Sequence, residues 1–144
     1  MSKRVIKYFL IVFLPYVVAG QNSTDWKSIL QEHKFQIIKD KKEIPLLITR
    51  EIADTITNIA NPKQKWNYSC STSTLPNYKL NWAATDGIRW IVSYTTGGYS
   101  MKISYRLFSS DSNEVIQNIG SRPKNFRKFK KLYLSGKLKE GSLF

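Results

Sequence analysis

Residues 78–108 read YKLNWAATDGIRWIVSYTTGGYSMKISYRLF, and apolar and polar side chains alternate along them with a period of two. This alternation is typical of β-strands that bury one face. It is interrupted twice by turn signals that contain glycine, and it resumes in a further segment, Glu114 to Ile119, after a polar turn. We therefore expect consecutive antiparallel strands joined by hairpins.

The second hairpin has Gly97-Gly98 at its turn, which is a strong signal for a two-residue loop. With these glycines at the centre, every cross-strand pair on one face is apolar. A correct register should give this result, because a shift of one residue turns every side chain to the other face. The predicted pairs are Tyr94 with Met101, Val92 with Ile103, Trp90 with Tyr105 and Ile88 with Leu107.

The first hairpin can be assigned by the same test. A two-residue loop at Asp86-Gly87 would bury the amide of Asn81 opposite Val92. A three-residue loop, Thr85-Asp86-Gly87, avoids this burial and gives Gly87 the left-handed conformation that a bulged hairpin needs. It pairs Trp82 with Trp90, Leu80 with Val92 and Tyr78 with Tyr94, and it predicts Trp82, Trp90 and Tyr105 on one buried face.

The predicted registers place Arg89 directly opposite Arg106 on the second face of the sheet, with Lys102 opposite Ser93. Like charges in direct opposition destabilise a hairpin. Either the two guanidinium groups turn apart into water, or a carboxylate or an external anion lies between them. Arg89 and Arg106 are therefore candidate contacts for an anion or a partner.

A helix is expected from Pro45, which suits the first turn of a helix. Four isoleucines follow at helical spacings of four, four and three, namely Ile48, Ile52, Ile56 and Ile59. This helix should end before Asn61-Pro62, since a proline disfavours helical geometry in the residue before it. Weaker patterns predict a short helix around Trp26 to Leu30, a strand at Phe35 to Ile38 and a long loop from Trp66 to Asn77.

The last segment predicts another amphipathic helix, which opens after Ser121-Arg122-Pro123 and ends at Gly136. Its apolar face carries Phe126, Phe129, Leu132 and Tyr133, and its other face carries Lys124, Arg127, Lys128 and Lys131. The aromatic side chains either pack on the sheet of the same domain or insert into a membrane. In both cases the four cations would attract phosphate, sulfate or carboxylate groups, and we count them as candidate anion or partner contacts.

Together these elements predict an α+β fold, in which one antiparallel meander sheet of four or five strands packs against one or two helices. The Pro45 helix, and with it the C-terminal helix, would cover the apolar face of the sheet. A chain of this length can bury about two-thirds of its unfolded surface, which is enough for a core without crosslinks.

Residues 1–20 have the three parts of an export signal in the required order. Basic Lys3, Arg4 and Lys7 come first, the apolar run Tyr8 to Val18 follows, and small Ala19 and Gly20 close it. The run is shorter than the ~20 apolar residues of a membrane span. We expect a secreted or periplasmic domain of residues 21–144 without a membrane span. The alternative is that the segment stays attached as an N-terminal anchor.

Charge favours anionic partners for this domain. The chain has 23 basic and 10 acidic residues, and without the three basic residues of the signal the net charge is still +10. Eight basic residues and no acidic one lie between Arg122 and Lys139. Export and the lack of an aromatic-rich platform motif argue against nucleic acid. An anionic polymer, an envelope surface or another protein fits better.

The sequence offers few groups for catalysis. His33 is the only histidine and Cys70 the only cysteine, which excludes a metal site of several imidazoles, a thiolate cluster and an internal disulfide. A nucleophile pair of Cys70 and His33 is conceivable, but no motif surrounds either residue. Glu51 and Asp54 fit the solvated face of the Pro45 helix. We expect no cofactor, no metal and no catalytic residue.

Four segments of the chain resemble small, uncharacterised exported proteins of Bacteroidetes-type bacteria: Ile59-Ala60-Asn61-Pro62, Lys65-Trp66-Asn67, Trp90-Ile91-Val92-Ser93-Tyr94 and Gly97-Gly98. The resemblance covers about the middle third of the chain. It implies a bacterial, exported, single-domain protein and provides no activity or site residues. The sequence thus predicts a non-enzymatic exported protein that contacts an anionic surface or a protein partner. The alternative is a small extracytoplasmic hydrolase.

The export signal gives the first testable prediction. Cleavage after Gly20 should leave Gln21, or a residue within one or two positions of it, as the mature N-terminus. N-terminal sequencing or intact-mass measurement of the protein from secreted and envelope fractions checks this. Full-length protein that retains Met1 in the cytoplasm would contradict it.

Overall fold

The alternating stretch folds into the centre of a six-stranded sheet, and three α-helices pack on it among the residues described. The computed structural model describes residues 24–99, 101–118 and 123–138, so the expected export signal and Ile119 lie outside it. The strands are β1 (Gln36–Ile38), β2 (Ile59–Ala60), β3 (Tyr78–Thr85), β4 (Trp90–Thr96), β5 (Lys102–Phe108) and β6 (Asn113–Asn118). The helices are α1 (Trp26–Glu32), α2 (Leu46–Ile52) and α3 (Phe126–Leu134), with 3-10 turns η1 (Lys41–Glu43) and η2 (Ile56–Asn58).

The predicted α+β fold and antiparallel meander are confirmed. Strands β3 to β6 follow one another as antiparallel neighbours. The remaining edge of β3 is shared by two short strands, because β1 pairs antiparallel with its end and β2 pairs parallel with its start. These two strands bring the sheet to six.

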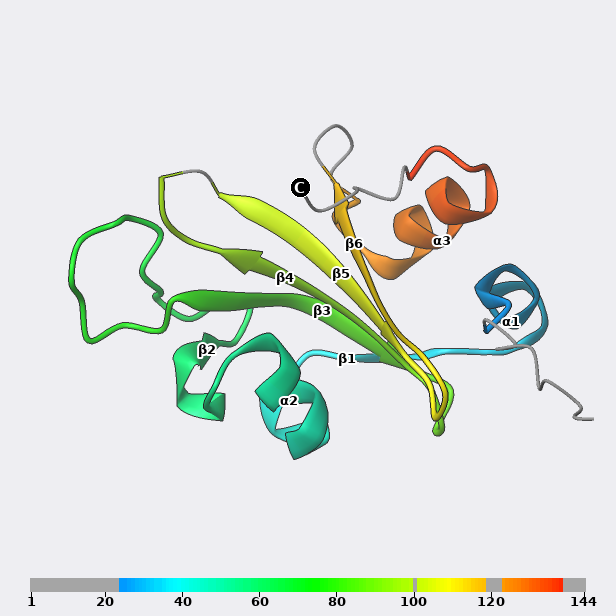
Figure 1. Cartoon of the computed structure of the whole chain (residues 1–144), viewed down its shortest axis with the longest axis horizontal. Helices are drawn as coiled ribbons and strands as arrows, with labels where there is room; N and C mark the ends of the chain where they lie inside the picture. The colour runs from blue at the N-terminus through cyan, green and yellow to red at the C-terminus, as the bar shows by residue number, and fades with distance from the viewer. Residues whose placement is uncertain (1–23, 100, 119–122, 139–144) are drawn as a thin grey trace, which may run out of the picture.

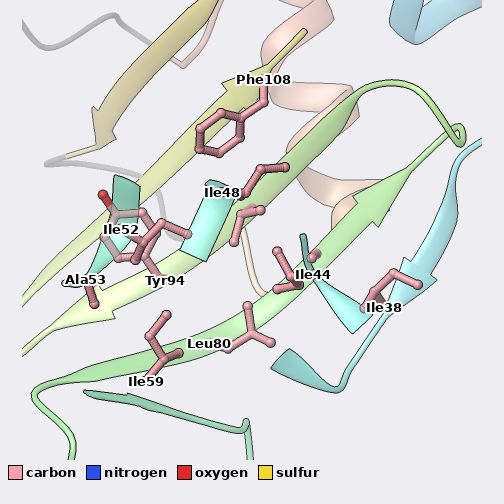
Figure 2. Packing of buried hydrophobic residues seen from close by; sticks show 11 residues of the cluster. Ile38, Ile44, Ile48, Ile52, Ala53, Ile59, Leu80, Tyr94 and Phe108 are labelled. Carbon is pink, nitrogen blue, oxygen red and sulfur yellow. The ribbon is translucent and has the colours of Figure 1, made fainter. Parts of the chain in front are cut away.

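Helices cover both faces of the sheet, with α2 on one side and α1 and α3 on the other (Figure 1). The expectation that the Pro45 helix and the C-terminal helix cover the same face is therefore wrong. On the α2 face, Ile48 and Ile52 of the helix pack with Leu80, Tyr94 and Phe108 of the sheet (Figure 2). On the α3 face the core contains Trp26, Leu30, Trp82, Ala84, Ile91, Tyr105, Leu107, Ile116, Phe129 and Leu138.

The register of the β4–β5 hairpin differs from the prediction by three residues. Trp90 pairs with Phe108 instead of Tyr105, and the pair nearest to the turn is Thr96 with Lys102. Gly97 is not the centre of a tight turn. A Cβ there would collide with the backbone oxygen of Asn67, so the glycine lets the 61–77 connection approach the sheet. Because the displacement is odd, every side chain of β5 faces the opposite side of the sheet from the one predicted relative to β4.

The β3–β4 hairpin is also longer than predicted. Thr85 pairs with Trp90, so residues 86–89 form the loop, and Gly87 has the expected positive φ of 97°. A β-bulge lies between Leu80 and Trp82. It puts Leu80 in the α2 core and Trp82 in the α3 core. Trp82 shares its face with Tyr105, as predicted, whereas Trp90 packs on the other side.

The Pro45 helix is shorter than the isoleucine spacing predicts. Helix α2 ends at Ile52, Ala53 is extended, and Ile59 belongs to β2. The segment between them includes Thr55 and Thr57, whose β-branched side chains have low helix propensity. Ile59 gains the strand pairing with Tyr78 and still reaches the same core as Ile52.

The C-terminal helix forms as predicted and packs on its own domain. Helix α3 begins after Asn125, whose side chain accepts a hydrogen bond from the Lys128 N–H, and the chain leaves it at Gly136, where φ is +67°. Phe129 is 0% exposed and contacts the rings of Trp82 and Tyr105. No helix among the described residues is long and apolar enough to cross a membrane.

The packing of α3 predicts a large loss of stability when its central aromatic side chain is truncated. Phe129→Ala should lower the free energy of unfolding by about 3–5 kcal/mol, because the cavity cannot collapse between helix and sheet. Urea denaturation followed by tryptophan fluorescence measures this. Lys131→Ala, on the exposed side of the same helix, is the control and should change stability by about 0.5 kcal/mol or less.

Candidate functional site

A groove of about 620 Å³ opens on the α3 face, where β1, the bulge of β3 and the start of α3 meet. Its volume lies within the range of about 300–1,000 Å³ that is usual for ligand sites. It is lined by Phe35, Ile37, Lys39, Pro62, Lys63, Asn81, Trp82, Lys124, Asn125, Phe126 and Arg127. We call it the cationic groove.

Four exposed cations line the cationic groove, and no acidic side chain does. They come from separate parts of the chain: Lys39 follows β1, Lys63 follows β2, and Lys124 and Arg127 flank the start of α3. Within residues 24–99, 101–118 and 123–138, none of the four forms an ion pair. Their uncompensated charge gives the groove a positive potential that attracts anions.

The start of α3 adds to this potential. The first N–H groups of a helix carry partial positive charge, and acidic side chains usually lie beside them. The first turn of α3 has no acidic residue and instead carries Arg127 and Lys128, with Lys124 just before the cap. The local sequence therefore departs from ordinary helix chemistry, as sequences do at functional sites.

Aromatic rings form the apolar floor of the groove. The ring centroids of Phe35 and Phe126 are 5.3 Å apart, and those of Trp82 and Phe126 are 5.8 Å apart in an edge-to-face arrangement. Trp82 is only 4% exposed, while Ile37 is 43% exposed and forms an open apolar wall. The groove thus combines an apolar floor with a cationic rim.

The bulge in β3 is held by hydrogen bonds of Asn81. Its Nδ2 donates to Ser93 Oγ at 3.2 Å and to Thr95 Oγ1 at 3.0 Å, and its Oδ1 accepts from Thr95 Oγ1 at 3.1 Å. Ser93 is the strand partner of Trp82 and also accepts a hydrogen bond from Asn81. Asn81 and Trp82 therefore lie on the same face of the sheet, although they are adjacent in the sequence. Both residues reach the groove for this reason.

Asn61 ties together the two segments that carry Lys39 and Lys63. Its Oδ1 accepts from the Lys41 N–H at 2.8 Å, and its Nδ2 donates to Asp40 Oδ1 at 3.2 Å. The backbone N–H of Lys42 and the Asn61 amide both donate to Asp40 and hold the pKa of that carboxyl below its ordinary value. This part of the rim is therefore fixed before any ligand binds.

The structure brings together some of the predicted site residues and separates others. Lys124 and Arg127 line the groove, whereas Lys128 and Lys131 are exposed on α3 outside its lining. Lys39 and Lys63 were not predicted. No pattern in the sequence marks them, because the fold alone brings their segments to α3.

The predicted opposition of Arg89 and Arg106 is wrong. Arg106 pairs with Val92, and its Nη1 lies 3.3 Å from Glu51 Oε2 on the α2 face. Arg89 belongs to the β3–β4 loop, where its Nη1 lies 3.5 Å from Asp86 Oδ2. Each arginine has its own carboxylate, so no anion is needed between them.

Arg89 lines a second pocket, of about 350 Å³, beside the β3–β4 loop. Asp86 is next to this pocket and its side chain is 5% exposed. Burial pushes the Asp86 pKa upward, but hydrogen bonds from the N–H groups of Arg89 and Ile88 and the nearby charges of Arg89 and His33 outweigh it. The pKa is therefore lowered from its ordinary value.

The second pocket contains a histidine near a carboxylate, but the hydroxyl group of Ser109 in this pocket is not hydrogen-bonded to that histidine. His33 Nδ1 lies 3.8 Å from Asp86 Oδ2. The Ser109 hydroxyl, which also lines the pocket, donates to Asp111 Oδ1 at 2.6 Å. No hydrogen bond joins Ser109 to His33 in the described part of the chain.

Cys70 and His33 are not brought together. The loop that contains the exposed Cys70 contacts Gly98 at one end of β4, and His33 lies by Asp86 at the other end. No group of three or more histidine, cysteine or acidic side chains that could hold a metal ion occurs among the described residues.

Comparisons of the chain with protein-family models, curated proteins and solved structures find no match. The function of the protein is therefore inferred from the geometry of its sites. The cations of the cationic groove have no ion-pair partner among the described residues, whereas Arg89 in the second pocket is paired with Asp86.

The lowered Asp86 pKa predicts how stability depends on pH. A carboxyl whose folded pKa is depressed stabilises the fold above its ordinary value of 3.8, and this contribution is lost as pH falls through the folded pKa. Asp86→Asn should cost about 1–3 kcal/mol at pH 7. The difference from the unchanged protein should shrink below pH 3.8, as urea denaturation at several pH values would show. A difference that stays constant with pH would contradict this role.

Proposed function

We propose that this protein is an exported, non-enzymatic binding protein that holds an anionic surface, polymer or protein partner at the cationic groove. The observation that carries this proposal is the lining itself, in which four exposed cations and no carboxylate surround a concave apolar floor. Export rests on the signal pattern of residues 1–20, which leaves residues 21–144 as the working domain.

The exposure of the four cations sets the kind of binding expected. Each exposed charge pair contributes about 0.2–1 kcal/mol, so affinity must come from several contacts at once. Such contacts are screened by salt, with a Debye length of about 10 Å at 0.1 M ionic strength. The net charge of +13 for the whole chain, or +10 without the signal, would also speed the approach of an anionic partner.

A small hydrolase is the second candidate, and the His33 to Asp86 approach favours it. Its site would be the second pocket, with His33 as the base and Ser109 as the nearest available hydroxyl group. The Ser109 hydroxyl is engaged by Asp111 and by Thr24, however, so it is not directed at the histidine. We therefore rank this activity below binding.

The groove predicts that the affinity for a polyanion depends on where the cations lie and not only on the net charge of the protein. Lys124→Glu with Arg127→Glu should weaken binding to dextran sulfate at 50 mM salt by about tenfold or more, since two contacts become repulsive. Wild-type binding should weaken steeply at 300 mM salt. Calorimetric titration measures both effects.

The matched control is Lys128→Glu with Lys131→Glu, which changes the net charge equally on the same helix but outside the groove lining. It should weaken binding much less than the groove variant. Acidic side chains near the start of α3 are favourable there, so the groove variant should keep its thermal stability. Equal losses in the two variants would contradict a site at the groove.

A further inference from the structure

The charges of the cationic groove are spread over three segments of the chain, and this limits the form of the ligand. Lys39, Lys63 and the pair at the start of α3 are all exposed at the rim. A single small anion is better held by buried, converging donors than by exposed side chains on separate segments. The ligand therefore carries several negative charges along its length.

The aromatic rings of the groove do not suit nucleic acid. Proteins that bind single strands present open aromatic faces on which successive bases stack. Here Phe35 and Phe126 pack against each other, and Phe126 packs against the 4% exposed Trp82. Their faces are largely used within the protein.

A lipid surface does not suit the groove either. The groove is concave, and a flat bilayer surface cannot follow its floor. The apolar side of α3 is also committed to the core, since Phe129 is fully buried against the sheet. The other two aromatic side chains of this helix, Phe126 and Tyr133, are partly buried and pack against the same core.

The remaining apolar surface suits a sugar ring. Ile37 and Pro62 provide aliphatic surface beside Phe35 and Phe126, which are partly buried. A pyranose ring offers C–H groups to such a surface and directs its hydroxyl, sulfate or carboxylate groups outward, toward a cationic rim. Within the described part of the chain, the side-chain amide of Asn125 caps α3 through its oxygen and donates no hydrogen bond, so its N–H groups can donate to a sugar hydroxyl.

From these constraints we infer that the ligand of the cationic groove is a segment of an acidic polysaccharide. The inference rests on the proposed function and adds the class of the partner. Sulfate or uronate groups lie against Lys39, Lys63, Lys124 and Arg127, and one sugar ring lies on Ile37. Hydroxyl groups of the same segment accept or donate hydrogen bonds at Asn125.

The test compares three probes of similar charge at one salt concentration: a sulfated hexasaccharide from heparin, inorganic polyphosphate and a thymidine oligonucleotide. We expect the hexasaccharide to bind about tenfold more tightly than the other two. Ile37→Ser should weaken hexasaccharide binding by about fivefold through the lost apolar contact and leave polyphosphate binding unchanged. Leu47→Ser is the control, because Leu47 is 76% exposed on α2, outside the groove lining.

The outcomes separate this inference from the proposed function. Equal affinity for all three probes, lost in Lys124→Glu with Arg127→Glu, would overturn the saccharide assignment and leave the anion-binding groove in place. Tighter binding of the oligonucleotide would overturn it in favour of nucleic acid. No binding of any probe at low salt would overturn both. Thermal unfolding of Ile37→Ser, compared with that of the unchanged protein, checks that a loss of binding does not come from unfolding of the variant.

Discussion

The bulge at Asn81 is the constraint on which the rest of the molecule depends. A regular strand would keep Tyr78, Leu80 and Trp82 on one face. The extra residue lets Leu80 enter the α2 core and Trp82 enter the α3 core, and the amide bonds of Asn81 to Ser93 and Thr95 keep it in place. Both cores and the floor of the cationic groove follow from this one irregularity.

The elements could be read from the sequence, but their registers could not. The meander, the α3 helix with its end at Gly136, and the loop before β3 follow from local patterns. Register depends on which face is buried, and here helices cover both faces. Val92 and Ile91 are equally buried neighbours on β4, so an apolar match on one face does not exclude a displaced pairing. Gly97 also misled the register prediction, because this glycine allows the backbone of Asn67 to come close and does not form the centre of a tight turn.

The candidate site was predictable to the extent that it lies on one helix. Lys124 and Arg127 were found from the helical wheel, which also selected Lys128 and Lys131 from the same face. Separating the two pairs requires knowing where the groove lies. Lys39 and Lys63 could not be found at all, since their approach to α3 depends on the pairing of β1 with β3 and on the bonds of Asn61. The Arg89 and Arg106 prediction failed because the connection between β4 and β5 is longer than a two-residue turn and displaces their register, and because Arg89 lies in the loop before β4.

Helix α3 links the groove to the stability of the domain. Cations around a helix start are unfavourable by about 0.3–1 kcal/mol each, so the local sequence alone opposes the first turn. Tertiary packing compensates, because burial of Phe129 contributes about 1.5–3 kcal/mol, which is comparable with the cost of these charges. The first turn of α3 is therefore stable only while the helix is docked on the sheet. An anion at the groove would relieve the same repulsion, so ligand binding and the docking of α3 should stabilise one another.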